Sequence, residues 1–396
     1  MIKREKYIHE IRSFYDSDLI KIITGVRRSG KSVLLQQLME EIKEKTSNVI
    51  YLNFEDLAIS GIINTPEKLI EYIEDHRNKE GRCYVFLDEI QTVENWASAC
   101  KTLRLHNNSL FITGSNSKLL SGEFTKELSG RYVSFTVRPF VFKELKEYGD
   151  QLGNEVSITD YLIWGGFPKR IEFPLVQSQK AYLNDLVNTI VINDLCNRYS
   201  IRKKDLFIHF VRYILITNSR IFSARSIHKY INDHYGTCSI NTILKYIQYL
   251  EEAYVIESVG QYSTKAKKEL SFYKKLYNVD VSLNSIMVID NRFDISHNLE
   301  NVVYNELRYM GYDVKVYDSS GKEIDFIASK DGKRYLVQVA YTIAEEKAYQ
   351  REFGAFKNID NSIKKIIITN DEFDYSTSAV QHISLSRFLF MSDLEG

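Results

Sequence analysis

The sequence predicts an α/β protein whose N-terminal part is built on a parallel sheet. Three apolar runs, at residues 19–24, 84–87 and 110–113, have the composition of strands that are covered on both faces. Each run ends in small, polar or acidic residues, and the first leads into a segment whose apolar residues keep to one helical face. A chain of 396 residues with 44% hydrophobic and 26% charged residues is long enough for two to four domains.

Composition excludes several classes of protein. The 52 Lys and Arg residues balance 52 Asp and Glu residues, so affinity for nucleic acid would have to come from a local patch. The four cysteines form no C-x-x-C pair, which indicates neither a disulfide framework nor a zinc site. The N-terminus lacks the apolar core of a signal peptide, and no segment has the roughly 18 apolar residues of a membrane span. We therefore expect a cytoplasmic protein without membrane contact.

The first apolar run leads into the pattern G-x-x-x-x-G-K-S, from Gly25 to Ser32, and then into a helix. Glycines allow consecutive backbone N–H groups to turn toward a phosphate at the positively polarised end of that helix. Lys31 would contact the β- and γ-phosphates, and the Ser32 hydroxyl can ligate Mg²⁺. The sequence thus predicts a site for ATP and Mg²⁺ formed by Gly25, Val26, Arg27, Arg28, Ser29, Gly30, Lys31, Ser32 and Val33.

Two adjacent carboxylates, Asp88 and Glu89, follow the second apolar run. The carboxyl ends of parallel strands meet at one edge of the sheet, where ligands bind in open α/β sheets. Asp88 would hold Mg²⁺, and Glu89 would orient and polarise the attacking water. The alternative is an ordinary solvated start of a loop, and the glycine loop upstream favours the functional interpretation.

The third run ends in residues 114–117, Gly-Ser-Asn-Ser. Asn116 or Ser115 would reach the γ-phosphate or the lytic water if this strand ends at the same sheet edge. A strand-to-helix turn with a helix cap is the alternative. The order of the three segments along the chain favours the functional interpretation.

The strings TGVRRSGKS, FLDEIQ, ITGSNSKLL and LSGRYVSFTVRPF resemble, in this order, the AAA+ superfamily. More narrowly, the chain resembles prokaryotic AAA-type ATPases that carry a C-terminal domain of unknown function. The resemblance implies ATP hydrolysis, a helical lid, and Asn116 or Ser115 at the sensor 1 position. Arg131 falls where such proteins often carry an arginine finger; a surface ion pair is the alternative, and Arg138 is a weaker candidate. A finger that acts on a neighbouring subunit requires a homo-oligomer.

Residues 165–168, Gly-Gly-Phe-Pro, resemble a signature of the lid region in this family. They predict a tight turn, because glycines permit unusual backbone angles and proline begins the next element. We assign them no catalytic role.

The middle of the chain predicts a winged helix. Two helical segments flank a turn at Gly236 and are followed by a strand-like run and by residues 264–275, which contain five lysines and one glutamate. Double-stranded DNA is the predicted partner, although a packing module is the alternative because Glu251 and Glu252 oppose a strong positive field. The outward residues of the second helix are of types that contact nucleic acid: Asn241, Lys245, Gln248 and Tyr249.

After residue 298 the predicted order α-β-β-β-α-β resembles the restriction-endonuclease-like core. In active members a helix Glu, a strand Asp and a Glu or Gln gather Mg²⁺, and the matching residues are Glu300, Asp325 and Gln338. Ala340 occupies the position of the catalytic lysine, and Gln338 is a weaker Mg²⁺ ligand than a carboxylate. We therefore expect a degenerate nuclease site on a scaffold that binds DNA or subunits. A substitute lysine from elsewhere remains the alternative, with Lys315, Lys322 and Lys333 as candidates.

The predicted organisation has four parts: a P-loop AAA+ core in residues 1–145, a helical lid in 146–205, a winged helix in 206–285 and a restriction-endonuclease-like domain in 286–396. The predicted function is Mg²⁺-dependent ATP binding and hydrolysis, coupled to a conformational change that acts on DNA or a protein partner. Two alternatives stay open: a nucleotide-gated binding switch with little turnover, and an ATP-regulated DNA nuclease.

Overall fold

A computed structural model describes residues 1–114, 128–262, 274–288, 294–319, 322–357, 359–360 and 362–395 of the chain. Contacts divide the chain into two compact units. The first contains residues 1–139 and 252–254, and the second contains residues 140–251 and 255–396. The division of the second unit into lid, winged helix and nuclease-like domain stays a prediction.

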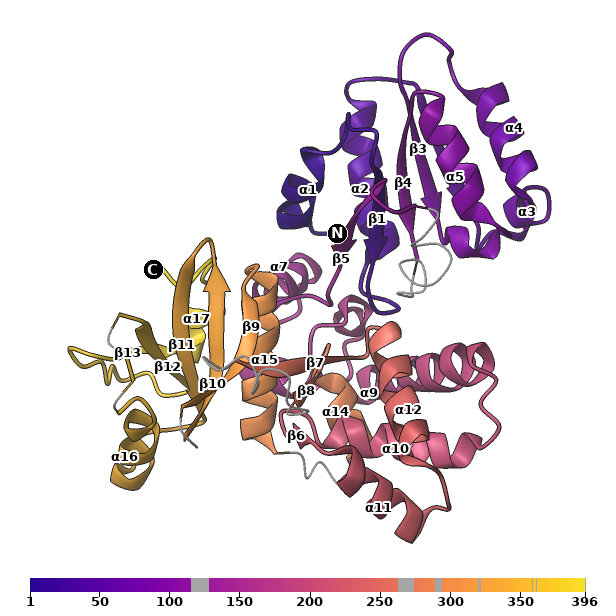
Figure 1. The fold of residues 1–396 in the computed structure, drawn as a ribbon. Helices are drawn as coiled ribbons and strands as arrows, with labels where there is room; N and C mark the ends of the chain where they lie inside the picture. The colour runs from indigo at the N-terminus through magenta and orange to yellow at the C-terminus, as the bar shows by residue number, and fades with distance from the viewer. Residues whose placement is uncertain are drawn as a thin grey trace. The chain divides into compact units, whose positions relative to one another are not determined.

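The first unit holds a five-stranded sheet in the order β2-β3-β4-β1-β5 (Figure 1). Every neighbouring pair is parallel, and the predicted apolar runs form β1, β3 and β4. Because β4 lies between β1 and β3, the ends of these three strands lie side by side. The strands are β1 (Ile20–Thr24), β2 (Val49–Asn53), β3 (Cys83–Asp88), β4 (Asn108–Thr113) and β5 (Tyr132–Thr136).

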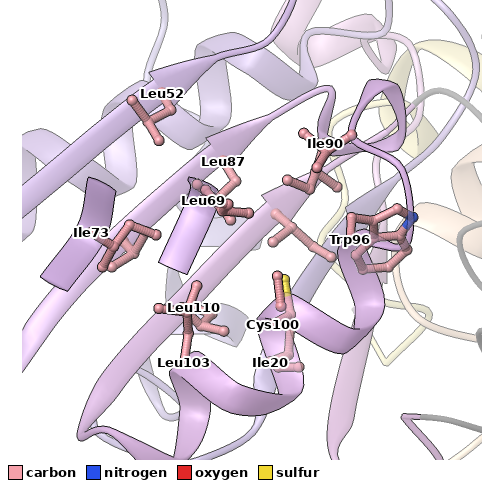
Figure 2. Close-up of a cluster of buried hydrophobic side chains, with 14 of the residues drawn as sticks. Ile20, Leu52, Leu69, Ile73, Leu87, Ile90, Trp96, Cys100, Leu103 and Leu110 are labelled. Atoms are coloured by element: carbon pink, nitrogen blue, oxygen red, sulfur yellow. The ribbon is translucent and has the colours of Figure 1, made fainter. Parts of the chain in front are cut away.

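Helices cover both faces of this sheet. On one face α2 contacts β1, β3 and β4, and on the other α4 and α5 cover the strands. Figure 2 shows side chains of α4 and α5 packed on those of the strands, and each labelled side chain is at most 2% exposed. This packing gives the sheet edge a rigid base. The helical segments are α1 (Glu5–Arg12), α2 (Lys31–Lys43), α3 (Leu57–Ser60), α4 (Pro66–His76), η1 (Ile90–Thr92) and α5 (Trp96–Leu105).

The second unit begins with a helical segment, as the pattern predicts. The Gly-Gly-Phe-Pro sequence joins a helix that ends at Trp164 to a 3₁₀ helix that begins at Pro168, as predicted for the proline. Gly166 N–H donates to the buried carboxylate of Asp280 at 2.7 Å. A Cβ on Gly165 would lie 1.8 Å from Asp280 Oδ1, and one on Gly166 would lie 1.8 Å from Phe140 O. Asp280 and Phe140 lie so close to the backbone of these two residues that only glycine fits at either position. The helices are α7 (Phe142–Leu152), α8 (Ile158–Trp164), η3 (Pro168–Glu172), α9 (Val176–Asn188) and η4 (Thr189–Cys196).

The next elements follow one another in the order helix, strand, helix, helix, strand, strand. Both β6 and β7 pair with β8 in the antiparallel sense. Ile243, Ile247 and Leu250 of α12 are buried at helical spacing, whereas Ile240 and Leu244, which the sequence pattern places on the same side, are exposed. The elements are α10 (Lys204–Ile216), β6 (Ile221–Phe222), α11 (Ala224–His234), α12 (Ile240–Glu252), β7 (Ile256–Tyr262) and β8 (Lys274–Asn278).

From residue 295 onward the elements follow the predicted order α-β-β-β-α-β, with one further strand and helix at the end, and a short helix precedes them. Within the described residues, β7 pairs in parallel with β9, so the sheet continues without a break in the order β13-β12-β11-β10-β9-β7-β8-β6. The sequence pattern gives no signal for this junction. The elements are α14 (Ser282–Met287), α15 (Ile295–Tyr309), β9 (Asp313–Ser319), β10 (Lys322–Lys330), β11 (Lys333–Ala340), α16 (Glu346–Ala355), β12 (Lys364–Thr369), β13 (Gln381–Ser384) and α17 (Leu385–Phe388).

Candidate nucleotide site

The glycine loop joins β1 to α2, so its last residues open a helix. Gly25 and Gly30 have φ angles of 135° and 95°, a region that favours glycine. A Cβ on Gly25 would lie 2.1 Å from Val137 O, which leaves no room for a side chain. Lys31 and Ser32 are the first two residues of α2. The backbone therefore has the strand-loop-helix form that phosphate binding requires.

The Lys31 ammonium lies inside this loop. Its Nζ donates to Gly25 O and Val26 O, both at 3.0 Å, and the side chain is buried. Burial lowers the pKa of Lys31 to about 8, although the nearby carboxylates of Glu89 and Asp88 act in the opposite direction. An anion in the loop would favour the charged form.

Asp88, at the end of β3, meets Ser32 at the edge of the sheet. Ser32 Oγ donates to Asp88 Oδ1 at 3.1 Å, and Tyr51 OH donates to Asp88 Oδ2 at 3.2 Å. The Thr113 hydroxyl donates to the same carboxylate, which is buried. The two predicted Mg²⁺ ligands, Ser32 and Asp88, are thus adjacent. Oxygen donors of this kind suit Mg²⁺, so these residues fit the ion that the motif implies.

Glu89 follows Asp88 in the left-handed region, with a φ of 53°. Its N–H donates to Thr113 Oγ1 at 2.9 Å, and its carboxylate accepts from the Gln91 amide. Thr113 therefore holds both acidic residues. Thr113 and Tyr51 were not predicted as residues of the site. The available signal for Thr113 was its position at the end of an apolar run.

The two remaining predicted residues of this site have different outcomes. Asn116, like Ser115, lies outside the described residues. Arg131 precedes β5, and its carbonyl accepts from Ile20 N–H at 2.9 Å, at the amino end of β1. The glycine loop follows the carboxyl end of β1, a strand of five residues that spans about 16 Å. Arg131 is therefore remote from the glycine loop of its own chain, and only its action on a neighbouring subunit stays a prediction.

Part of the first unit matches a known protein family. Residues 17–146 match the model of a family described as AAA domain. Residues 155–292 and 296–388 match two domains of unknown function, DUF8612 and DUF4143. An uncharacterized protein of Haemophilus influenzae is 32% identical over 387 residues, which cover 94% of each chain. The chain belongs to the AAA+ family of P-loop proteins.

A second relative of this AAA+ protein comes from another organism. An uncharacterized protein of Methanocaldococcus jannaschii is 32% identical over 381 residues, or 89% of this chain and 82% of that one. Among solved structures, the Aeropyrum pernix ORC1 protein in complex with DNA is 11% identical and has a TM-score of 0.33, with 72% of this chain and 92% of that one covered. AMPPCP-bound DnaA from Aquifex aeolicus is 15% identical and also has a TM-score of 0.33, with coverage of 64% and 89%.

The predicted nuclease residues of this AAA+ protein surround a lysine that the sequence analysis missed. Lys275 on β8 is 5% exposed. Its Nζ lies 3.0 Å from Glu300, 2.6 Å from Glu323 and 3.5 Å from Asp325. Gln338 lies beside them, because its Oε1 accepts from Asp325 N–H at 3.3 Å. The structure therefore brings Glu300, Asp325 and Gln338 together.

The neighbouring carboxylates stabilise the protonated, charged form of Lys275. Burial by itself would lower the pKa of Lys275, but the carboxylates of Glu300, Asp325 and Glu323 raise it above its ordinary value. Burial and the charge of Glu300 raise the pKa of Asp325, whereas the charge of Lys275 lowers it. In the part of the chain that the structure describes, no group of three or more His, Cys, Asp and Glu side chains could hold a metal ion. The ammonium group of Lys275, and not a metal-binding arrangement, therefore links these carboxylates.

The structure corrects two expectations about lysine side chains. Lys275 was expected to contact phosphate as one of the wing lysines, yet it is buried against carboxylates. Lys333, one of the lysines considered as a substitute for Ala340, lies on the surface and pairs with Glu395.

Among the described residues, none of the helices combines the length and the apolar character that a membrane span requires.

Lys275→Met is expected to destabilise the second unit by about 3–5 kcal/mol, because it leaves buried carboxylates without their cation. Urea denaturation followed by circular dichroism measures the loss. Lys274→Met is the matched control, since Lys274 is the exposed preceding residue of β8. Equal stability of the two variants would show that the Lys275 pairs contribute nothing net.

Proposed function

We propose that this protein binds ATP at residues 25–33, hydrolyses it in the presence of Mg²⁺, and couples hydrolysis to a conformational change. The observation that carries the proposal is the 3.1 Å contact between Ser32 Oγ and Asp88 Oδ1, beside the buried ammonium of Lys31. The contact brings the two proposed Mg²⁺ ligands together from segments that are 56 residues apart in the sequence. A glycine-rich turn with an incidental lysine would not require it.

Each residue of the site has a distinct proposed role. The loop amides and Lys31 would bind the phosphates, and Ser32 and Asp88 would hold Mg²⁺, which neutralises phosphate charge when bound. Glu89 would accept a proton from the attacking water or orient that water. Asn116 would contact the γ-phosphate or the water, and Arg131 would enter the site of a neighbouring copy in a homo-oligomer.

Binding and phosphate release by the purified full chain test this proposal. We expect saturable uptake of ATP with Mg²⁺ and slow, Mg²⁺-dependent release of phosphate that stops when EDTA is added. Specific activity that rises with protein concentration would support the role of Arg131 between subunits. Absence of saturable uptake at millimolar ATP and Mg²⁺ would refute the nucleotide site itself.

A second proposal concerns the partner. The order α10-β6-α11-α12-β7-β8, with both β6 and β7 paired to β8, supports a winged helix. Asn241, Lys245 and Gln248 on α12 are exposed, as residues that contact a DNA groove must be. We propose that this face contacts double-stranded DNA. A protein partner remains the other option for the same surface.

The affinity for a duplex, measured at several salt concentrations, tests the DNA proposal. Lys245→Ala is expected to weaken binding several-fold and to lower the slope of affinity against salt by about one ion. Lys143→Ala, which removes an exposed lysine from α7, is the control. Identical affinity of wild type and Lys245→Ala at every salt concentration would contradict DNA contact through α12.

The two alternatives predict different turnover. A nucleotide-gated switch would retain ATP tightly and hydrolyse it far more slowly than it exchanges it. An ATP-regulated nuclease is the less favoured alternative, since the ammonium of Lys275 already occupies the space between Glu300 and Asp325. We propose that the C-terminal domain is a scaffold for DNA or subunit binding, and that the protein acts in the cytoplasm.

A further inference from the structure

Arg4, ahead of α1, is a buried arginine that contacts the nucleotide loop. Its side chain is one of the largest fully buried groups in the described residues, with 2% of its surface exposed. Its Nη1 donates to Ser29 O at 3.1 Å and to Arg138 O at 2.9 Å. One guanidinium nitrogen therefore joins the glycine loop to the segment that follows β5.

The bond to Ser29 fixes the orientation of one peptide group in the loop. In a planar trans peptide the carbonyl and the N–H point in opposite directions. Because Arg4 holds Ser29 O, the N–H of Gly30 points away from Arg4. Gly30 is the residue before α2, and the N–H groups at this end of a helix are the ones that bind phosphate. Arg4 thus orients a phosphate donor without itself needing to reach the nucleotide.

The other end of the loop rests on the same segment. Val137 N–H donates to Thr24 O at 2.8 Å, and Gly25 packs so closely on Val137 O that a Cβ there would lie 2.1 Å away. The loop is therefore anchored at Gly25 by Val137 and at Ser29 by Arg4, which also bonds Arg138 O. Removal of Arg4 releases only the second anchor.

Arg4 is itself held in place. Its backbone N–H donates to Gln37 Oε1 of α2 at 3.1 Å, and its guanidinium carbon lies 4.6 Å from the centre of the Tyr7 ring. The Tyr7 hydroxyl accepts from Arg138 N–H at 3.1 Å. These contacts orient the guanidinium before any ligand arrives, so binding need not order it.

We propose that Arg4 is a positioning residue of the nucleotide site, which holds the Ser29–Gly30 peptide in the orientation that phosphate binding requires. This inference rests on the proposed binding of ATP at residues 25–33. It adds the segment before α1 to the site, although that segment lies outside the loop motif. It also predicts that the contribution of Arg4 acts on the phosphates and not on the adenosine part of the ligand.

The test compares the affinity of wild type and Arg4→Ala for Mg·ATP and for inorganic triphosphate with Mg²⁺, by isothermal titration calorimetry on the full chain. Arg4→Ala is expected to weaken both ligands by the same factor of about ten or more, because the lost bonds are to a charged donor. Arg4→Lys, which keeps a cationic donor, is expected to recover part of this loss for both ligands. A general loss of packing would instead reduce the folded fraction, which thermal unfolding reports separately.

Arg12→Ala is the matched control. Arg12 ends α1, and its guanidinium bonds Glu41 of α2 at 2.7 and 2.9 Å, so its removal loosens the same helix without touching a loop carbonyl. We expect Arg12→Ala to lower thermal stability and leave both affinities within about twofold of wild type. Equal affinities of Arg4→Ala and Arg12→Ala would overturn the role of Arg4, as would an Arg4→Ala loss confined to ATP. If wild type takes up neither ligand, the proposed nucleotide site fails, and the role of Arg4 fails with it.

Discussion

Glu89→Gln is expected to lower the turnover of ATP by at least about 100-fold and to leave the affinity for Mg·ATP within about threefold of wild type. The amide has the shape of the carboxylate but cannot accept a proton from water or polarise it. Glu89 is held to Thr113 through its backbone N–H, so the substitution keeps the contact that positions the residue. Single-turnover phosphate release and equilibrium binding, measured on the same preparation, separate the two effects.

Glu94→Gln is the control for this prediction. Glu94 is an exposed glutamate five residues further along the same segment, so it tests whether loss of one negative charge near the sheet edge matters by itself. We expect wild-type turnover in Glu94→Gln. Wild-type turnover in Glu89→Gln as well would show that another group activates the water, or that turnover is not the function of the site.

Lys31→Ala is expected to remove detectable binding of Mg·ATP, a loss of at least about 100-fold in affinity. The ammonium of Lys31 lies within hydrogen-bond distance of two loop carbonyls, at the place where the motif puts the phosphates. Burial already lowers the pKa of Lys31 to about 8, which means that the buried charge works against folding before a ligand binds. Thermal unfolding without nucleotide should therefore show no loss of stability in Lys31→Ala, and the loss of binding can be assigned to the site.

Lys43→Ala provides the comparison for Lys31→Ala, because Lys43 is an exposed lysine at the other end of the same helix, α2. Equilibrium binding of a fluorescent ATP analogue measures both variants. Wild-type affinity is expected for Lys43→Ala. Retained affinity in Lys31→Ala would contradict the assignment of residues 25–33 as the phosphate site, whatever the turnover of the protein proves to be.

The sequence by itself determined the local parts of the nucleotide site. An apolar run, two glycines and a one-sided helical pattern suffice to predict β1, the loop and the start of α2, because strand, turn and helix preferences act over a few residues. The carboxylates of Asp88 and Glu89 were predictable for the same reason, since they end a strand whose own composition is apolar. The continuation of the second sheet was not predictable in this way, because the pairing of β7 with β9 joins segments separated by a lysine-rich stretch and two helices.

The tertiary structure decided which distant side chains complete each site. Thr113 meets Asp88 only because β4 lies between β1 and β3, an order that parallel pairing sets and no short pattern encodes. Lys275 of β8 reaches Glu300 because α15 packs on β8, and it reaches Asp325 because β8 and β10 belong to one sheet. Arg4 reaches Ser29 because the segment before α1 is anchored to α2 through Gln37. Such contacts depend on pairing and packing between elements far apart in the chain, and these depend on the whole fold.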